Sequence, residues 1–210
     1  MSDPERYPRR AQRARETRRR ITAAATELFV ERGYQATPVT AIAERADVAP
    51  QTFYATFGTK HAVLATAIDV AIAGDDDPIP VNDRPWMRPV WDAPDAPSTL
   101  RAYAAAVRLI QARVGALLQV LDLAAASEPE LGELHRESDR RRRLGASGVV
   151  EVAAQRGRLG DGLEFERAVD IAWTLNGHDV YLDLTRECGW SHEEYESWLA
   201  DTLIKLLLES

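Results

Sequence analysis

Apolar residues near the start of the chain recur with the period of an α-helix. From Arg15 onward they are spaced three and four positions apart, which places them on one face of a helix. Gly33 follows where a helix commonly ends in a left-handed residue. Residues 1–15 combine Pro4 and Pro8 with many arginines, so we expect a flexible basic arm there. The apolar positions of the predicted helix are Ile21, Ala24, Ala25, Leu28 and Phe29.

Two short amphipathic stretches follow and are joined by a tight turn at residues 46–49. Threonine is a good N-cap and proline suits the first helical position, so Thr37 and Pro38 predict the start of the first helix. Pro50 opens the second helix in the same way, and Thr59 caps a further helix. The pattern therefore predicts a compact group of helices whose second and third members are short.

The helical pattern stops between Gly74 and Pro97, where six prolines lie between positions 78 and 97. We expect a domain junction or a long ordered loop in this segment. From Ser98 the pattern predicts further helices, over residues 98–127, 129–156, 164–188 and 191–208. No stretch alternates as a strand would. The sequence thus predicts an all-α protein, with a three-helix helix-turn-helix domain at 16–62 and a second helical domain at 63–210.

The composition narrows the cellular setting. Cys188 is the only cysteine, which excludes an internal disulfide and favours a reducing cytoplasm. No apolar run approaches the roughly 20 residues that span a membrane. The charged residues 1–20 have no apolar region behind them, so they do not form a secretory signal. We expect a cytoplasmic protein without membrane contact.

Charge is distributed unevenly along the chain. The net charge is −7, yet residues 1–60 hold 11 Lys+Arg and 7 Asp+Glu, which gives +4. The remaining 150 residues hold 15 and 26, which gives −11. A basic front end on an acidic body is typical of a protein that meets DNA through one domain.

The helix predicted from Pro50 has two chemically different faces. Phe53 and Phe57 lie four positions apart and are expected to pack into the core. The opposite face carries small or hydrogen-bonding residues, namely Pro50, Gln51, Thr52, Ala55 and Thr56. A helix that enters the major groove needs this division, with polar side chains near its N-terminus and a braced second helix behind it.

The stretch from Thr17 to Leu64 resembles the signature of the TetR (tetracycline repressor-like) family. It covers less than a quarter of the chain; beyond it only the helical pattern and the length are similar. The resemblance implies a sequence-specific DNA-binding regulator, a repressor released from its operator by a small molecule. The matching positions are Ala25, Leu28, Phe29, Gly33, Tyr34, Thr37, Ile42, Ala43, Ala46, Val48, Thr52, Phe53, Tyr54, Phe57 and Lys60.

The resemblance also implies roles for individual residues. Thr37 and Thr40 would contact phosphates, as would Tyr54 and Lys60. The residues expected in the major groove are Gln51, Thr52 and Ala55, with Pro50 at its mouth.

Several positions leave alternatives open or depart from the family pattern. Asp47 stands where the family usually has glycine, and Asp tolerates a left-handed backbone. Ala49 replaces a common serine cap, so one capping or phosphate contact is missing. Tyr54 could instead be a packed residue. Arg18–Arg20 could contact DNA or simply begin a solvated helix, whereas for Arg140–Arg143 we favour solvent exposure and local ion pairs.

Symmetric DNA sites are read by dimers, so we expect a homodimer on an inverted-repeat operator of double-stranded DNA. The last two predicted helices carry apolar residues on more than one side, and the resemblance implies that they meet a second copy as a four-helix bundle. The alternative is that these stripes are intramolecular core. The expected interface residues are Val169, Trp173, Val180, Leu184, Trp198, Leu199, Thr202, Leu203 and Leu206.

The other C-terminal helices are expected to surround a pocket for an unknown effector. Tryptophans in the proline-rich segment are unusual for a plain linker and could form a wall or lid. The expected lining residues are Trp86, Trp91, Tyr103, Leu117, Leu121, Trp173 and Asn176.

Other classes of function have less support. The sequence contains no Gly-rich phosphate loop, no nucleophile elbow and no clustered His/Asp/Glu set, so we expect neither an enzyme nor a cofactor. The four histidines are far apart in the sequence and lack metal-ligand spacing, so no metal site is expected. A helical protein-interaction module with a basic docking arm remains an alternative to the regulator, and activation remains an alternative to repression.

Overall fold

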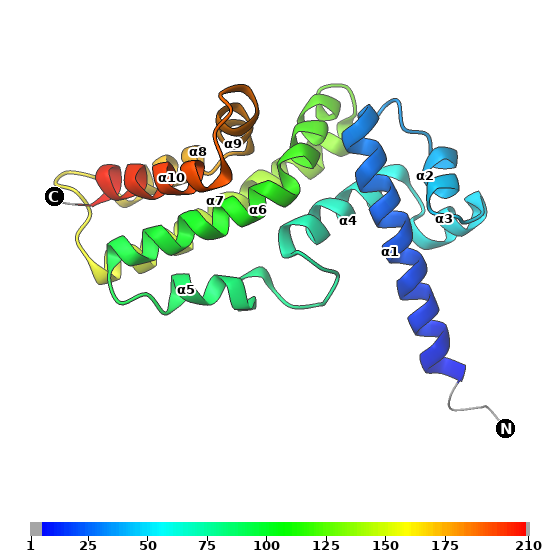
Figure 1. The fold of residues 1–210 in the computed structure, drawn as a ribbon, viewed down its shortest axis with the longest axis horizontal. Coiled ribbons are helices and arrows are strands. Elements are labelled where there is room, and N and C mark those ends of the chain that lie inside the picture. Colours follow the sequence, from blue (N-terminus) through cyan, green and yellow to red (C-terminus); the bar gives the residue numbers. More distant parts are fainter. Residues whose placement is uncertain (1–5, 209–210) are drawn as a thin grey trace.

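The computed structural model describes residues 6–208, which fold into helices joined by loops (Figure 1). Within these residues no strand forms, apart from an isolated bridge between Leu159 and Leu208. The all-α prediction is confirmed. The elements are α1 (Arg6–Arg32), α2 (Val39–Arg45), α3 (Pro50–Phe57), α4 (Lys60–Ala73), η1 (Val81–Asp83), η2 (Pro85–Met87), α5 (Arg88–Trp91), α6 (Ala96–Ala125), α7 (Pro129–Arg156), α8 (Phe165–Leu175), α9 (His178–Leu182), the π-helix η3 (Asp183–Glu187) and α10 (His192–Leu207).

The first helix is longer than the sequence pattern indicates. It begins at Arg6, so residues 6–15, predicted as a flexible arm, form its first turns; residues 1–5 lie outside the described residues. Arg, Ala, Gln and Glu are good helix formers, and Pro8 stands in the first turn, where its missing N–H has no helical partner anyway. This part of α1 projects away from the helices around it (Figure 1). From Arg6 onward the segment predicted as a flexible arm is therefore helical.

A first hydrophobic core joins α1, α2, α3 and α4. Ile21, Phe29, Ile42 and Phe53 are all fully buried in it. The core extends onto the C-terminal half of α6, whose buried side chains face α1 and α4. The helix-turn-helix is thus fixed directly to the longest helix of the second domain.

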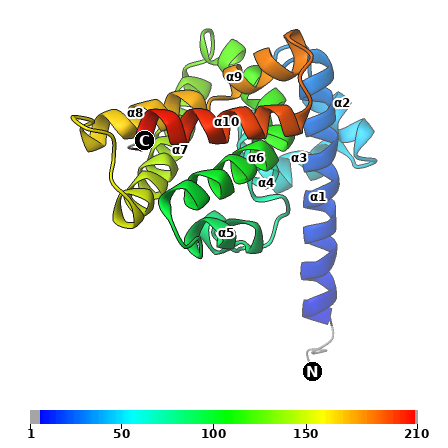
Figure 2. The ribbon, with the colours of Figure 1, turned by 60° about the vertical axis from the view of Figure 1, so that its left-hand side comes forward.

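A second core forms where α6 and α7 pack together, with α8 and α10 lying across them (Figure 2). Helix α6 is long and apolar enough to cross a membrane, but half of its most apolar stretch is buried inside the protein. Its apolar character is explained by its central position between α4, α7, α9 and α10.

The proline-rich segment is an ordered loop with short helical turns, packed beside α6 (Figure 1). Arg84 is only 3% exposed and holds the first half of the loop through Asp75 and the carbonyl oxygens of Asp77 and Ile79. Arg156 of α7 donates to the carbonyl oxygens of Val90 and Trp91 and so holds the second half.

The helix predicted over 164–188 is interrupted, and this part of the prediction is wrong. Helix α8 ends at Leu175, and Gly177 is extended, with φ −62° and ψ 147°. The carbonyl oxygen of Asn176, freed by the break, accepts a hydrogen bond from Gln111 Nε2 at 2.7 Å. A tertiary contact from α6 therefore stabilises a break that local periodicity does not reveal.

Candidate nucleic-acid interface and internal cavity

The turn between α2 and α3 depends on a left-handed aspartate. Asp47 has φ 50°, the only positive φ of a non-glycine residue in the described part of the chain. Val48 N–H donates to Ala43 O at 2.9 Å and closes the turn. Arg20 of α1 donates to the carbonyl oxygens of Ala46 and Asp47. The expected tolerance of Asp47 for this backbone is confirmed, and Ala49 caps α3 without a side-chain hydrogen bond, as its missing hydroxyl implies.

Helix α3 presents one face to the core and the other to solvent. Phe53 is its only buried residue, and it packs edge-on against Tyr54 and tilted against Phe57. Tyr54 itself is 54% exposed, so the packed alternative is not what the structure shows. The remaining side chains predicted to reach DNA from this helix are Pro50, Gln51 and Ala55, which are exposed, and Thr52, which is half-buried.

Two residues predicted to contact phosphates make hydrogen bonds within the protein instead. Thr37 is fully buried, and its hydroxyl lies within hydrogen-bond distance of the carbonyl oxygens of Leu28 and Gly33, so it neither reaches a phosphate nor caps α2; Pro38 is the N-cap residue. Lys60 Nζ donates to Tyr34 O at 2.9 Å and lies over the Tyr34 ring. Burial lowers the pKa of Lys60.

Exposed Thr40 remains in a position to contact DNA, because it stands in the first turn of α2. Helix α2 has no side-chain cap, so the N–H groups of its first turn lack a side-chain acceptor.

The arginines at positions 18–20 are mainly structural. Arg18 stacks over the Phe57 ring and donates to Thr66, while Arg19 binds Asp76. Arg20, as described above, braces the turn. Arg13 is exposed beside an open hollow between α1 and α3, which is also lined by Thr52, Ala55 and Thr56. Helix α1 thus places positive charge next to the polar face of α3.

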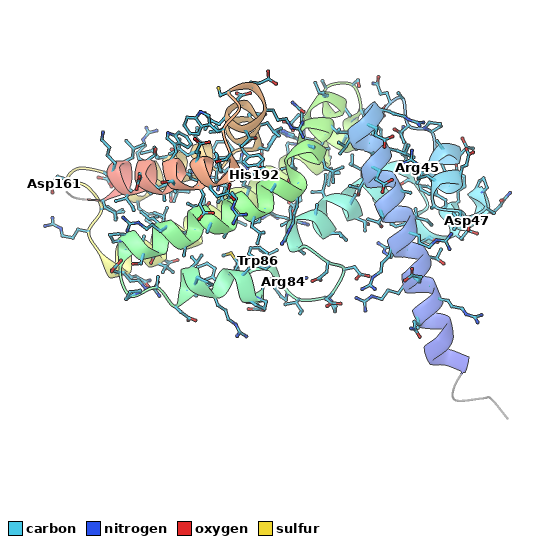
Figure 3. All side chains as sticks on the ribbon, in the orientation of Figure 1. Arg45, Asp47, Arg84, Trp86, Asp161 and His192 are labelled. Carbon is cyan, nitrogen blue, oxygen red and sulfur yellow. The ribbon has the colours of Figure 1, made fainter. Side chains whose placement is uncertain are left out.

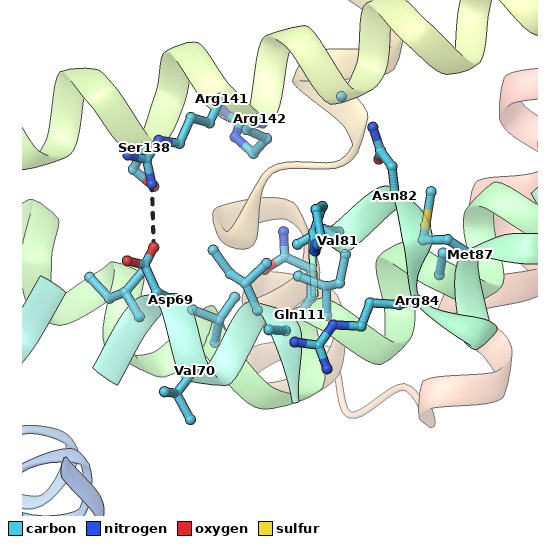
Figure 4. Close-up of a pocket in the computed structure, with 18 of the residues that line it drawn as sticks. Asp69, Val70, Val81, Asn82, Arg84, Met87, Gln111, Ser138, Arg141 and Arg142 are labelled. Carbon is cyan, nitrogen blue, oxygen red and sulfur yellow. Dashed lines mark hydrogen bonds and ion pairs between the residues drawn. The ribbon is translucent and has the colours of Figure 1, made fainter. Parts of the chain in front are cut away.

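A cavity of about 760 Å³ opens between α4, α6, α7 and the 75–87 segment. Figure 4 shows Arg84, Met87, Gln111 and Arg142 around it, and an ion pair between Arg141 and Asp69 at 3.4 Å on its rim. Burial raises the pKa of Asp69, and the Arg141 charge opposes this shift. The wall also contains Ile68, Ile72, Val107, Ile110, Leu118 and Val149, so it combines apolar side chains with charged residues of both signs.

A buried polar network forms one end of the cavity. Asn176 donates from Nδ2 to the Tyr103 hydroxyl, and its Oδ1 accepts from Arg142 at 2.7 Å. Burial raises the pKa of Tyr103 to about 12, so this hydroxyl stays protonated at neutral pH. Gln111 Oε1 is buried and has no hydrogen-bond partner among the residues that the structure describes, which leaves one acceptor available beside the cavity.

Only some of the residues predicted to contact the effector lie on the cavity wall. Tyr103 and Asn176 line the cavity, as expected. Leu117 and Leu121 do not: both are fully buried in the core that joins α6 to α1 and α4, because α6 turns this face toward the helix-turn-helix.

The predicted tryptophans also lie outside the cavity wall. Trp86 and Trp91 pack against the second core, and Trp91 donates to Asn82 O, so they brace the loop instead of closing the cavity. Trp173 is covered by Arg142 and Arg143. Figure 3 shows Trp86 and Arg84 on the loop beneath α6.

The sequence pattern missed the charged residues of the cavity. The sequence pattern does not distinguish Arg84, Arg141 and Arg142 from ordinary loop or surface arginines. In the structure all three line the cavity. For Arg140 and Arg141 the expected local pairing is present, since both bind Glu137. The periodicity of the sequence does not distinguish Arg142 from the arginines next to it. Only the folded structure shows that Arg142 points toward Asn176.

The cavity is linked to α1 by ion pairs. Asp75, Asp76 and Asp77 lie on its wall, and Asp76 receives hydrogen bonds from Arg15 at 2.9 Å and from Arg19 at 2.8 Å. These guanidinium groups hold the pKa of Asp76 well below its usual range. Helix α4, which lines the cavity, also packs directly on α1.

Three of the predicted interface residues cannot reach a second copy of the chain in this conformation. Val169, Leu199 and Leu203 are at most 1% exposed and belong to the core between α6, α8 and α10. Leu206 is 47% exposed. The other predicted interface residues are half-buried, namely Trp173, Val180, Leu184, Trp198 and Thr202.

Known proteins share both the local sequence and the overall fold. The family described as "Bacterial regulatory proteins, tetR family" matches residues 21–67. The uncharacterised HTH-type transcriptional regulator YdeS of Bacillus subtilis is 30% identical over 158 residues, which cover 75% of this chain and 74% of YdeS. The HTH-type transcriptional regulator TcmR of Streptomyces glaucescens is 31% identical over 105 residues, 50% of this chain and 42% of TcmR.

Solved structures match over nearly the whole chain. FadR from Bacillus subtilis, solved in complex with stearoyl-CoA, has a TM-score of 0.69 at 20% identity and covers 88% of this chain and 96% of its own. A regulator from Saccharomonospora viridis, solved in complex with choline, has a TM-score of 0.69 at 17% identity and covers 93% and 99%. These likenesses show the fold, and the relationship to YdeS extends the local family match through most of the chain. The chain belongs to the TetR family and is a DNA-binding transcriptional regulator.

Proposed function

We propose that this regulator is a homodimeric repressor that binds an inverted-repeat operator and releases it when a small molecule occupies the cavity between α4, α6 and α7. The exposed face of α3 carries the DNA-binding part of the proposal. Gln51, Tyr54 and Ala55 lie in solvent while Phe53 anchors the same helix in the core. We place this activity in the bacterial cytoplasm, where the DNA is.

The geometry around the cavity supports ligand control. A molecule that fills it would contact α4 and the Asp75–Asp77 segment, and both are attached to α1. A shift of either would therefore move the helix that carries the helix-turn-helix. A ligand changes DNA affinity only if it binds the two arrangements with different affinity, so the proposal requires a cavity that changes shape between them.

The cavity lining favours an amphipathic effector. Its apolar side chains suit a hydrocarbon or ring portion, while the charged residues of both signs on the wall and the Gln111 Oε1 acceptor suit a polar or hydrogen-bonding group. FadR and the Saccharomonospora viridis regulator were solved with stearoyl-CoA and choline, ligands of different chemistry on one fold. The wall residues, not the fold, therefore determine which effector is bound.

The dimer proposal rests on the outer surfaces of α8 and α10. These helices lie next to each other on one side of the bundle (Figure 2), and α10 exposes Leu206. Trp198 is half-buried and stacks edge-on with Trp190 at 6.0 Å between ring centroids. Aromatic and aliphatic side chains of this kind are enriched in homodimer interfaces.

Replacing Leu206 with arginine is expected to convert the dimer to monomers. In a two-fold interface the substitution places a charge in the contact twice, and burying unpaired charge costs several kcal/mol. We expect the dimer dissociation constant to rise at least about 100-fold, which corresponds to about 2.7 kcal/mol. Sedimentation at micromolar protein measures this, with Leu123→Arg as a matched control because Leu123 is 76% exposed on α6. Equal effects of the two variants, or a monomeric wild type, would contradict the dimer surface.

Capture of genomic DNA tests the whole proposal. Fragmented DNA is retained on purified protein without added ligand and then sequenced. We expect enrichment of an inverted repeat, and retention that falls steeply as salt rises, because phosphate contacts release counterions. No enrichment at low salt from a folded dimer free of co-purified ligand would reject the repressor and favour the protein-interaction module.

A further inference from the structure

A cluster of imidazole and carboxylate groups lies away from both the DNA-binding surface and the cavity. Asp122 of α6, His135 of α7, and His178 and Asp179 at the start of α9 meet where these helices pack together. The ligand atoms of Asp122, His178 and Asp179 all lie within 4.8 Å of one another. None of these residues lines the cavity described above.

The distances converge on the two oxygens of Asp122. His178 Nε2 lies 2.7 Å from Asp122 Oδ2, and His135 Nε2 lies 3.0 Å from Asp122 Oδ1. The same His178 nitrogen also lies 3.2 Å from Asp179 Oδ1. An Nε2 atom carries at most one hydrogen, so it cannot make a full hydrogen bond to both carboxylates at once. A metal cation in place of that hydrogen would be coordinated by His178 Nε2 and by one carboxylate oxygen each from Asp122 and Asp179.

The burial of His178 and the charges of the two carboxylates also favour a bound cation. His178 is only 8% exposed, whereas Asp179 is exposed and gives access from solvent. Among the side chains that the structure describes, neither Asp122 nor Asp179 has an arginine or lysine at ion-pair distance. Among the described residues, these two carboxylates therefore have only histidine side chains as ion-pair partners, which favours a bound cation between them.

We propose that Asp122, His178 and Asp179 form a binding site for a divalent transition-metal ion, with His135 as a positioning residue that holds Asp122 through its other carboxylate oxygen. One imidazole nitrogen and two carboxylate oxygens, with a fourth position left for water, suit Zn²⁺, Co²⁺ or Ni²⁺, since Mg²⁺ and Ca²⁺ prefer oxygen donors alone. Donors around a tetrahedral Zn²⁺ lie about 3.3–3.5 Å apart, given metal–donor distances near 2.1 Å. The spacings of 2.7 and 3.2 Å from His178 Nε2 to Asp122 and Asp179 need only a small outward movement to admit the ion.

The site has a clear structural consequence. It joins α9 to α6 and α7 directly after the break at Gly177, and Leu121, next to Asp122, is buried against the helix-turn-helix core. A bound ion would fix the start of α9 against the end of α6 that contacts the DNA-binding domain. Metal binding would thus stabilise the junction of the two domains, whether or not the cavity binds an effector.

Cobalt binding tests the site without DNA or effector, so its outcome is independent of the proposed repressor function. Tag-free protein is stripped with chelator and titrated with Co²⁺, whose d–d absorption reports coordination by nitrogen and oxygen. We expect one Co²⁺ per chain and a higher melting temperature. His178→Ala should weaken binding at least about 100-fold and Asp179→Asn at least about 10-fold, since even outer-shell partners of a metal contribute about 10–100-fold.

The controls separate the site from non-specific binding by histidine. His61→Ala is the matched variant, because His61 pairs with a single carboxylate, Glu130, at 2.8 Å, and is expected to bind Co²⁺ like the wild type. Asp179 is exposed, so its variant decides the matter even if His178→Ala does not fold. No saturable binding by the wild type, or unchanged binding by both site variants, would show that the cluster is a hydrogen-bonded ion-pair group only.

Discussion

Phe53→Ala is expected to lower the free energy of unfolding by about 3–5 kcal/mol, the usual cost of removing a buried aromatic ring and leaving a cavity. Phe53 is fully buried and is the only buried residue of α3. The helix has eight residues and no side-chain N-cap, so it has little stability of its own. Loss of this anchor should release α3 from the core and abolish operator binding. Urea denaturation followed by circular dichroism measures the stability change.

The neighbouring Tyr54 provides the control for this experiment. Tyr54→Ala changes an aromatic residue of the same helix that is 54% exposed, so we expect it to cost only the edge-on contact with Phe53, about 0.5–1.5 kcal/mol. If both variants lose stability equally, then Phe53 does not anchor α3 in the way its burial indicates. If Phe53→Ala is as stable as the wild type, the packing of the first core is not as described.

The double variant Gln51→Ala, Tyr54→Phe is expected to bind the operator at least about 100-fold more weakly while unfolding like the wild type. Gln51 and Tyr54 are both exposed on α3, so neither substitution opens a cavity. A good base-edge contact contributes about 1–3 kcal/mol, and a hydrogen bond to a charged phosphate about 1.5–3 kcal/mol. Fluorescence anisotropy with the captured inverted repeat measures the affinity at fixed salt.

The two single variants distinguish recognition of the base sequence from binding to the phosphate backbone. Gln51→Ala should reduce discrimination at one base pair of each half-site, whereas Tyr54→Phe should weaken binding about equally on all sequences. Gln35→Ala is a suitable control, because Gln35 is exposed but bonds to Ser127 in the loop between α6 and α7, away from α3. A double variant that binds the operator like the wild type would show that α3 does not enter the groove through this face.

Local sequence was sufficient for much of this protein. Helix periodicity, with a cap at Thr59, predicted most helices within a few residues, because a cap acts on the first turn of its own helix. The two faces of α3 and the left-handed Asp47 turn were likewise readable, since they depend on residues a few positions apart. The helix-turn-helix, and with it the family, could therefore be identified from the sequence alone.

Groups that meet across the fold could not be predicted in this way. Thr37 and Lys60 match the family pattern of phosphate contacts, yet in the structure they bond to the carbonyl oxygens of Gly33 and Tyr34, and Thr37 is fully buried. An apolar position predicts burial but not the partner, so Leu117 lies against the helix-turn-helix core instead of the cavity. The proposed interface and effector contacts remain predictions for the same reason.

The sequence by itself determined the helices, the DNA-binding motif and the basic front end, because these follow from the spacing of neighbouring residues. The tertiary structure alone decided where α8 ends, which charged residues line the cavity, and that Asp122 meets His135 and His178. His178 lies 56 positions from Asp122 along the chain. No local pattern encodes such a meeting, because it depends on how α6, α7 and α9 pack against one another.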